Sequence, residues 1–403
     1  MKLDNKIILL GVTGGIAAYK ALELVRLLVK QHAIVNVVMT ANAERFVGKM
    51  SFQALSGNPV LSDTFDLAAG AEIKHISVPD DADIAVVAPA TADFIGKVAH
   101  GIADDMLTTM MLAMTGPVLI APSMNVHMYG NRIVQDNIRR LKQYGYHFME
   151  PGEGWLACGY EGKGRLADPE QIMDETELLL TKKDLKNRKV LVTAGPTREY
   201  LDPVRFISNP SSGKMGYAIA RAARMRGARV TLVSGKVTLK PPYGVDFIEI
   251  ESARQMLEQV SSLFKKMDAI VMTSAVSDFA PSQKSAQKIK KTSQFLDIRL
   301  DRTPDILSHI AKDKGRRVIV GFAAETDNLQ QYAKEKLRRK HMDMIVANDV
   351  TDRDSGFGVD TNKALLIFKD GTMQDLPVMQ KSVLANVILD RLSLLITGRK
   401  AGK

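Results

Sequence analysis

The chain has 403 residues, of which 45% are hydrophobic and 25% charged, and a formal net charge of +10. This length exceeds what one hydrophobic core usually organises and the composition is that of a globular protein, so we expect two folded domains and exclude disordered or fibrous classes. No apolar run approaches the roughly 18 residues that cross a bilayer, and a single cysteine, Cys158, excludes an internal disulfide and a CxxC pair.

The positive charge suits anionic ligands, and phosphorylated small molecules satisfy it as well as nucleic acid does. Nothing in the sequence resembles a recognition helix, a zinc finger or an aromatic RNA-binding strand, which makes nucleic acid the weaker interpretation. The opening MKLDNKIILLGVTGG contains Asp4 and a short apolar stretch that ends in a Gly turn, as a first β-strand does. We therefore expect a cytoplasmic protein, not bound to membrane, whose partners are small molecules.

The first half opens with a βαβ pattern. An apolar strand is predicted at 6–10, a Gly-rich turn at 11–15, an amphipathic helix at 16–30 and a returning strand at 34–39. Further buried strands are predicted at 84–88 and 118–120. This alternation predicts a parallel sheet with helices on both faces.

The Gly-rich turn lets backbone N–H groups and a helix N-terminus approach a phosphate, although such turns also occur only to pack a strand against a helix. The spacing of Gly11, Gly14 and Gly15 is not GxGxxG, which favours a mononucleotide over a dinucleotide. Small polar residues follow the strands that end near Pro89 and at 120. They lie where ligands bind in open α/β sheets, or they form tight connections to the next helix.

Five motifs in this order, namely TGGIAAYK, HIS, PATAD, PSMNVHMY and a late ACG, resemble the flavin-dependent cysteine decarboxylase family. The resemblance implies a flavodoxin-like domain over residues 1–180 that binds FMN. It implies that His75 and Asn125 handle the substrate carboxylate and that Cys158 donates the final proton. The implied FMN contacts are Gly14, Gly15 and Ile16 at the phosphate end and Thr40, Ala88, Pro89, Ala90 and Thr91 around the rest.

Two of these residues have plainer interpretations. An isolated His75 is usually a surface histidine, and Cys158 could be a buried structural thiol, although its Gly-rich loop is more typical of a lid that closes over substrate. Tyr129 and Tyr160 depart from the family pattern, in which Trp and Asp are commoner at these positions. Both departures concern neighbours of the implied catalytic residues.

A helix is predicted at 169–180, followed by a charged interdomain linker at 181–189. The second half then repeats the βαβ pattern, with a strand at 190–193, a long loop to Gly213, a helix to Arg226 and a strand at 229–233, and adds buried strands at 269–273, 318–321 and 344–347. SSGKMG opens the helix but lacks the GxxxxGK[ST] spacing of a phosphate-loop ATPase. The chain is thus predicted to contain two doubly wound, Rossmann-like domains.

The motifs TAGPTREYLDPVRFISN, SSGKMG, SAVSDF, KIKK, TPDIL, GFAAET and ANDV resemble phosphopantothenate-cysteine ligase over residues 190–403. Together the two halves resemble the bifunctional decarboxylase and ligase of coenzyme A biosynthesis. The resemblance implies that Asn209 contacts the reacting acyl group. It also implies a CTP site formed by Met272, Thr273, Ser274, Asp278, Lys288, Pro304, Asp305, Ile306, Leu307, Phe322, Lys336 and Lys340.

Joining a carboxylate to an amine requires a leaving group, which attack on the α-phosphate of CTP creates as an acyl-cytidylate. The approach of two anions requires positive charge, which Lys288 and a Mg²⁺ held by Asp278 would supply. Asp278 could instead be a helix N-cap, Asn209 a turn residue, and KIKK a solvated basic face. No residue pattern distinguishes CTP from ATP, and the resemblance alone implies CTP.

Three other functions fit less well. An NAD(P)-dependent reductase requires GxGxxG with an acidic residue closing the second strand, which neither half contains. A non-catalytic flavin-binding regulator would leave Cys158 and the ligase half unexplained, and prenyl transfer to FMN would need neither Cys158 nor His75. The resemblance further implies a homo-oligomer, with trimeric flavin domains and dimeric ligase domains.

Overall fold

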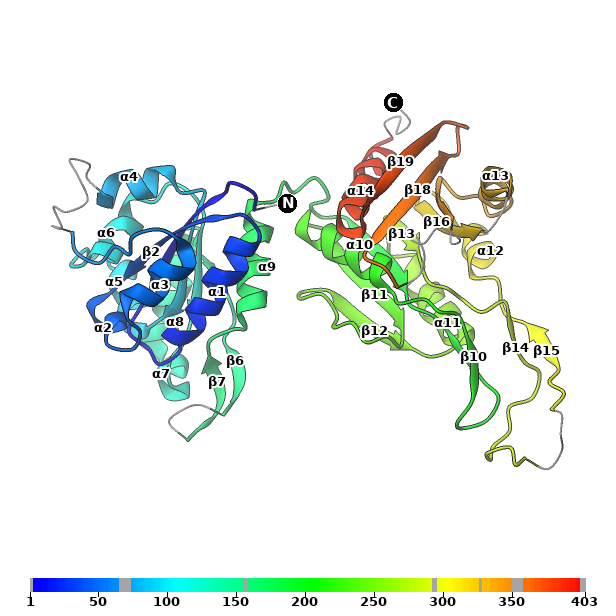
Figure 1. The fold of residues 1–403 in the computed structure, drawn as a ribbon, viewed down its shortest axis with the longest axis horizontal. Coiled ribbons are helices and arrows are strands. Elements are labelled where there is room, and N and C mark those ends of the chain that lie inside the picture. The colour runs from blue at the N-terminus through cyan, green and yellow to red at the C-terminus, as the bar shows by residue number, and fades with distance from the viewer. Residues whose placement is uncertain are drawn as a thin grey trace. The chain divides into compact units, whose positions relative to one another are not determined.

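The computed structural model describes residues 3–64, 74–155, 159–291, 296–325, 328–349 and 358–398. It divides into two compact units, Met1–Thr181 and Lys182–Lys403, each with its own sheet (Figure 1). Within the described ranges, no helix is both long enough and apolar enough to span a membrane.

The first unit contains a five-stranded parallel sheet in the order β2-β1-β3-β4-β5. Its strands are β1 (Ile7–Val12), β2 (Ile34–Met39), β3 (Ile84–Ala90), β4 (Val118–Pro122) and β5 (His147–Phe148). All seven residues of β3 are buried, as expected of a strand covered on both faces. The order reverses between β1 and β3, which is the flavodoxin-like arrangement and confirms the predicted fold.

Two groups of helices cover the faces of this sheet (Figure 1). One contains α1 (Ala18–Lys30), α3 (Lys49–Ser56) and α9 (Pro169–Leu180), and the other α4 (Lys74–Asp81), α5 (Ala92–Ala99), α6 (Met106–Ala113) and α8 (Arg132–Gln143). Helix α1 buries Ala18, Ala21, Leu24, Val25 and Leu28 at helical spacing. Short helices α2 (Ala41–Glu44) and α7 (Val126–Gly130) follow β2 and β4.

The sequence predicted a loop around Cys158, but much of this segment is a hairpin. Strands β6 (Gly152–Trp155) and β7 (Glu161–Arg165) pair antiparallel, with Gly154 opposite Gly162. These glycines have φ values of 135° and 149°, which disfavour any other residue. The hairpin was missed because glycines replace the apolar alternation that marks a strand. Cys158 itself lies outside the described residues.

The second unit contains an eight-stranded sheet in the order β12-β11-β8-β13-β16-β17-β18-β19. The first six strands are parallel and have the Rossmann order: β8 (Lys189–Ala194), β11 (Arg229–Gly235), β12 (Asp246–Ile250), β13 (Ala269–Met272), β16 (Val318–Glu325) and β17 (Met344–Asp349). The doubly wound prediction is confirmed. The antiparallel pair β18 (Thr361–Phe368) and β19 (Met373–Gln380) was not predicted.

Each face of this sheet has its own core. Helices α10 (Lys214–Met225) and α14 (Lys381–Ile396) pack on one face, and α11 (Ala253–Phe264), α12 (Ile306–Ala311) and α13 (Leu329–Arg339) lie on the other. Side chains of β8 point alternately to the two faces, so Val190 and Val192 pack in the first core and Leu191 in the second.

Residues 181–189, predicted as a linker, are folded over much of their length. Leu185 is buried in the core beside α10, and Asp184 forms an ion pair with Arg226, which also bonds Asp390 at 2.7 Å. Lys189 already belongs to β8. The segment was predicted to be a linker because it is highly charged, and its single buried leucine gives no periodic pattern.

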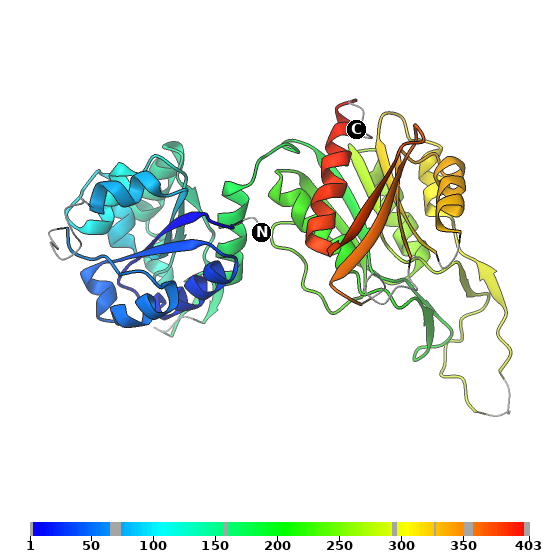
Figure 2. The same ribbon diagram turned by 45° about the horizontal axis from the view of Figure 1, so that its top comes forward.

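Two segments extend from the second sheet at the carboxyl ends of its parallel strands (Figure 2). One is the hairpin of β9 (Arg198–Tyr200) and β10 (Phe206–Ser208), and the other is the arm that begins with β14 (Phe279–Pro281) and returns as β15 (Leu300–Arg302). Strand β14 packs against β9, so the two segments are in contact.

Candidate active sites

The first unit has a hollow of about 540 Å³ at the carboxyl ends of β1, β3 and β4, within the size range of ligand pockets. Among the residues predicted to bind flavin or substrate, those that line it are Gly14, Gly15, Ile16, Thr91 and Asn125. The β6–β7 hairpin supplies Trp155, Gly164 and Arg165 to its wall. The hollow lies at the point where the strand order reverses.

A buried threonine holds the two central loops of this hollow together. The Thr13 hydroxyl donates to the Pro89 carbonyl at 2.8 Å and accepts the Thr91 N–H at 3.0 Å. The Thr13 N–H also donates to the Pro89 carbonyl, at 3.2 Å. Thr13 was not predicted as a site residue, although a polar residue at the end of a buried strand indicates such a role.

The N-terminus of α1 opens onto the hollow. Its N-cap, Ala17, supplies no side-chain cap, and the Ala18 and Lys20 N–H groups donate to the Gly15 and Ala17 carbonyls at 2.9 and 3.0 Å. Lys20 and Arg165 add positive charge to the lining. This donor set suits a phosphate group, as the phosphate end of FMN requires.

Gly14 is needed for close packing of the β1 loop on α2, because a Cβ atom there would lie 2.4 Å from Asn42 Cβ. We expect Gly14→Ala to lower the free energy of unfolding of the first unit by about 1–3 kcal/mol and to weaken flavin retention. Urea unfolding followed by the fluorescence of Trp155, the one tryptophan, measures the first effect. Gly15→Ala is the matched control, since its Cβ would lie 3.8 Å from Thr91 Cγ2; equal losses in both variants would refute the packing explanation.

The remaining predicted residues lie elsewhere or only support the hollow. Ala88, Pro89 and Ala90 are buried within β3 and do not line it. Thr40 caps α2, its hydroxyl accepting the Ala43 N–H at 3.3 Å. His75 is half-buried on α4 and is absent from the lining. The motifs predicted the segments around the hollow, but they did not distinguish the residues that line it from those that support it.

Two residues at α7, Asn125 and Met128, line the hollow, and their neighbours in the chain have partners of their own. Asn125 is the N-cap of α7, and its side-chain oxygen accepts the His127 N–H at 2.8 Å. The His127 ring contacts Tyr160 edge-on at 5.0 Å. Tyr129 donates to Glu150 at 3.3 Å, and burial, with the nearby carboxylate, raises the pKa of Tyr129. The two tyrosines that depart from the family pattern thus have side-chain partners near α7.

The second unit has a hollow of about 760 Å³ at the strand ends of β13 and β16. Of the residues predicted to bind CTP, all except Thr273 and Lys288 line it: Met272, Ser274, Asp278, Pro304, Asp305, Ile306, Leu307, Phe322, Lys336 and Lys340. They come from four separate segments of the chain. The fold therefore gathers residues that the sequence places up to 68 positions apart, from Met272 to Lys340.

An adjoining hollow of about 400 Å³ shares Ser274, Val276, Asp278, Phe322 and Lys336 with the first. It contains Thr273 and Asn209, whose amide donates to the Ala275 carbonyl at 3.1 Å. It also includes the start of α10, where Gly213 is the N-cap with φ 77°. Asn362 and Lys381, which the sequence analysis did not select, complete its wall.

Charged groups line the larger hollow. Lys340 is buried, and burial lowers its pKa, although it forms an ion pair with Asp305 and bonds Ser308 Oγ at 3.0 Å. Asp305 is the N-cap of α12, and Lys336 donates to the Phe322 carbonyl at 3.0 Å. Asp278 is exposed at the opening. Among the described residues no group of three or more His, Cys, Asp or Glu side chains could hold a metal ion.

Lys288 lines neither hollow, but a buried carboxylate fixes the backbone next to it. Asp202 accepts the N–H groups of Val204 and Arg205 at 2.8 Å and that of Ile289 at 3.1 Å. The Arg205 guanidinium donates to it as well, at 3.3 Å. Asp202 therefore joins the arm that carries Lys288 to the loop between β9 and β10. Asp202 lies within the TAGPTREYLDPVRFISN motif, but no role was predicted for it.

Burial alone would raise the pKa of Asp202, but the three N–H groups and Arg205 hold it below its ordinary value. A carboxylate with a lowered folded-state pKa stabilises the fold above its unfolded pKa of about 3.9, and this stabilisation is lost as the pH falls through the folded-state value. We expect Asp202→Asn to destabilise the second unit at pH 7 and to flatten its loss of stability in acid.

Hydrogen exchange in urea, read by mass spectrometry at pH 7 and pH 3.5, separates this unit from the first. Asp297→Asn, which changes an exposed carboxylate of the same arm, is the control. Wild-type protection of the second unit in Asp202→Asn at pH 7 would rule out this role.

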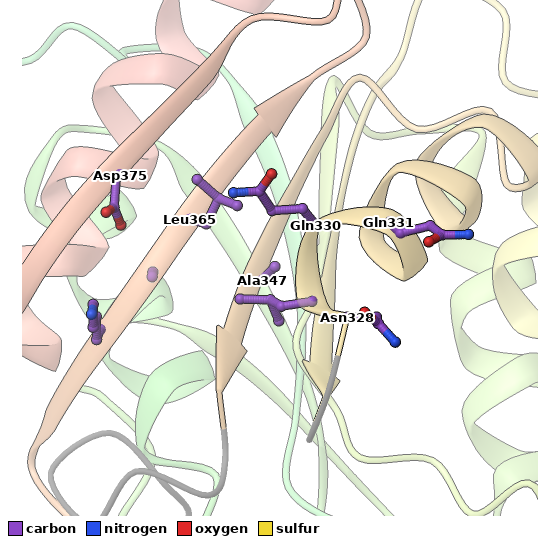
Figure 3. A pocket seen from close by; sticks show the side chains of 9 residues that line it. Asn328, Gln330, Gln331, Ala347, Leu365 and Asp375 are labelled. Carbon is purple, nitrogen blue, oxygen red and sulfur yellow. The ribbon is translucent and has the colours of Figure 1, made fainter.

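A further hollow of about 500 Å³ lies between α13 and strands β17 to β19. Figure 3 shows Leu365 of β18 and Asp375 of β19 on one side and Gln330 of α13 on the other. Lys363 also lines it, on the face of β18 opposite to Asn362. None of the predicted site residues belongs to this hollow.

Two family models match the chain. One, described as flavoprotein, matches residues 1–181, and one, described as DNA/pantothenate metabolism flavoprotein C-terminal domain, matches residues 185–395. The coenzyme A biosynthesis bifunctional protein CoaBC of Bacillus subtilis (strain 168) is 49% identical over 397 residues, which is 98% of each chain. The protein of the same name from Escherichia coli (strain K12) is 43% identical over 397 residues, covering 97% of this chain and 98% of its own.

Among solved structures, the C-terminal domain of a coenzyme A biosynthesis bifunctional protein CoaBC is 40% identical, with a TM-score of 0.47. The match covers 54% of this chain and the whole of that domain.

Proposed function

The chain belongs to the family of coenzyme A biosynthesis bifunctional proteins CoaBC, and from this premise we propose which residues carry its two activities. It is an enzyme of coenzyme A biosynthesis that has a ligase and a flavin-dependent decarboxylase. We assign the decarboxylase to residues 1–180 and the ligase to 190–403. The ligase joins cysteine to 4'-phosphopantothenate, and the decarboxylase converts the product to 4'-phosphopantetheine.

The ligase assignment is supported by the gathering of ten predicted nucleotide-binding residues, from Met272 to Lys340, around one hollow. We propose CTP as the nucleotide. The substrate carboxylate attacks its α-phosphorus and displaces pyrophosphate, and the cysteine amine then attacks the acyl carbon and displaces CMP. Asn209, at the edge of the adjoining hollow, orients the acyl group.

Positive charge is what the first ligase step requires, since two anions must meet. Lys336 and Lys340 lie in the nucleotide hollow, and we propose that Lys288 approaches it from the arm. Asp278 would hold Mg²⁺ together with phosphate oxygens of the nucleotide, because Mg²⁺ in such sites commonly takes one or two carboxylates and substrate phosphates. The ion would neutralise charge that develops on the phosphate.

We propose FMN as the flavin in the hollow of the first unit. Its phosphate would lie at the N-terminus of α1, near Gly14, Gly15 and Ile16. When bound, FMN supplies the two-electron oxidation of the substrate thiol that makes loss of CO₂ feasible, and returns the electrons afterwards. Asn125 and His75 hold the carboxylate that departs, and Cys158 donates a proton to the carbon atom left behind.

His75 does not line the flavin hollow of its own unit. We propose that the protein is a homo-oligomer, with trimeric flavin units and paired ligase units, as the family resemblance implies. A trimer would allow His75 on α4 to serve the site of a neighbouring subunit. Analytical ultracentrifugation of the intact protein measures the number of subunits in the oligomer.

The test of both assignments is one reconstituted reaction. Purified protein is incubated with 4'-phosphopantothenate, cysteine, Mg²⁺ and either CTP or ATP, and nucleoside monophosphate, CO₂ and product mass are followed. We expect CMP, CO₂ and phosphopantetheine with CTP. Equal rates with ATP would overturn the nucleotide assignment, and accumulation of phosphopantothenoylcysteine in flavin-loaded protein would overturn the assignment of the first site.

A further inference from the structure

The smaller hollow of the second unit has a wall that the proposed reaction does not yet use. It is built from Asn362 on β18 and Lys381 at the start of α14. We propose that these two residues form a subsite for a phosphoryl group. This inference rests on the ligase site proposed above and extends it to a part of the chain, residues 358–381, in which no predicted site residue lies.

Asn362 is the first observation. Its side chain lines the hollow although the residue is only 4% exposed, and its Oδ1 atom is buried without a hydrogen-bond partner. Buried amides normally have partners, so an unsatisfied one requires an explanation, such as an absent ion or ligand. Oδ1 is an acceptor, and rotation of the amide by 180° about its last bond would place the NH₂ group, with its two donors, at the unpaired position, where it suits phosphate oxygens.

Lys381 is the second observation. It is only 8% exposed, and its ammonium group donates to the Val359 carbonyl at 2.5 Å. Lys214 lies close by and bonds Asp360 Oδ1 at 2.7 Å. Burial and the charge of Lys214 lower the pKa of Lys381, while Asp360 opposes this shift. Two lysines and one carboxylate leave a net positive charge at this wall.

The backbone adds to the positive electrostatic potential at this wall. Both α10 and α14 begin here, with N-caps Gly213 and Gln380, and neither cap residue makes a side-chain cap hydrogen bond. These helices have 12 and 16 residues, and their N-termini favour anions. Two ammonium groups, an amide and two helix N-termini match a phosphoryl dianion, which has more charge and more acceptors than a carboxylate.

The reaction offers two sources of such a group. One is the terminal phosphates of the nucleotide, which leave as pyrophosphate, and the other is the phosphate of 4'-phosphopantothenate. Steady-state kinetics of ligation distinguishes them, because the KM for each substrate is measured with the other saturating. In Lys381→Met we expect the KM for one of the two to rise by roughly 10- to 100-fold, as for loss of a charged hydrogen bond. The kcat should stay within about threefold of the wild type.

Matched variants make the result interpretable. Lys363→Met removes a lysine from the opposite face of the same strand as Asn362 and should leave both KM values unchanged. Lys381→Arg should restore most of the loss. Asn362→Asp, which keeps the shape but adds negative charge, should raise the same KM as Lys381→Met, and it replaces that variant if thermal unfolding shows Lys381→Met to be misfolded.

Lys340→Met reports on the nucleotide site independently. A raised KM for CTP in Lys381→Met assigns the subsite to the nucleotide, and a raised KM for 4'-phosphopantothenate assigns it to the acyl substrate. If Lys340→Met weakens CTP but the Lys381 and Asn362 variants change neither KM, the subsite is wrong and the ligase site stands. If Lys340→Met also has no effect, the placement of the ligase site is wrong as well.

Discussion

In Cys158→Ser we expect formation of 4'-phosphopantetheine to slow by about 10²- to 10⁴-fold, the usual contribution of a positioned acid, while each flavin site still releases its first equivalent of CO₂. A serine hydroxyl is a far weaker acid than a thiol, so the carbon left by decarboxylation would lack its proton donor. Formation of phosphopantothenoylcysteine should continue at the wild-type rate, because the two units have separate cores and separate sites. Mass spectrometry would show that intermediate accumulating.

Bound flavin is the control for Cys158→Ser. Its absorbance should match that of the wild type, since the lining described for the hollow consists of other residues. Formation of 4'-phosphopantetheine by the variant at the wild-type steady-state rate would exclude Cys158 as the proton donor. A loss of flavin together with activity would point instead to a structural thiol.

In Lys288→Gln we expect ligation to slow by about 10²- to 10³-fold with little change in CO₂ release from added phosphopantothenoylcysteine. The change removes a cation that would strengthen its interaction as charge develops on the phosphate, an effect of this size in comparable sites. CMP formation from CTP, in a single turnover, is the measurement.

Lys290→Gln and Lys291→Gln are matched controls, because all three lysines lie in one exposed run. Lys288 and Lys290 flank Ile289, whose N–H group bonds Asp202, so Lys290 is the nearer control and Lys291 the more distant one. If all three variants lose similar activity, the run acts as a general positive surface and the specific role of Lys288 is refuted.

The long apolar strands were predictable from the sequence. β3, β13 and residues Met344–Ala347 of β17 are continuous buried runs. A strand covered on both faces is apolar throughout, so its prediction does not depend on an alternating pattern. The edge strand β19 escaped prediction, since it buries only Leu376 and presents a mostly polar pattern. Glycines concealed β6 and β7 in the same way. Elements that rely on pairing rather than burial carry a weak sequence signal. Strand β18 was also not predicted, although its residues Ala364–Phe368 form a buried apolar run.

Site residues also differ in how far they could be predicted from the sequence. Residues after buried strands, such as Thr91 and Ser274, were predictable because parallel strands end at one edge of a sheet. Asp202 was not, because its role depends on Ile289, which is 87 positions away. Asn362 and Lys381 were not predicted either, since they enter the hollow from the antiparallel part of the fold. No local pattern records a contact of this kind.

The place of α14 in the second core determines when that core can form. Leu384, Ile388 and Leu392 of this helix pack into the cluster that contains Val190 and Val192. A ribosome releases residues 1–181 first, and that unit can complete its core at once. At about 5–20 residues per second, the second core waits on the order of 10 to 45 s longer for its last helix. During synthesis the flavin unit can therefore fold and bind its cofactor before the ligase of the same chain exists.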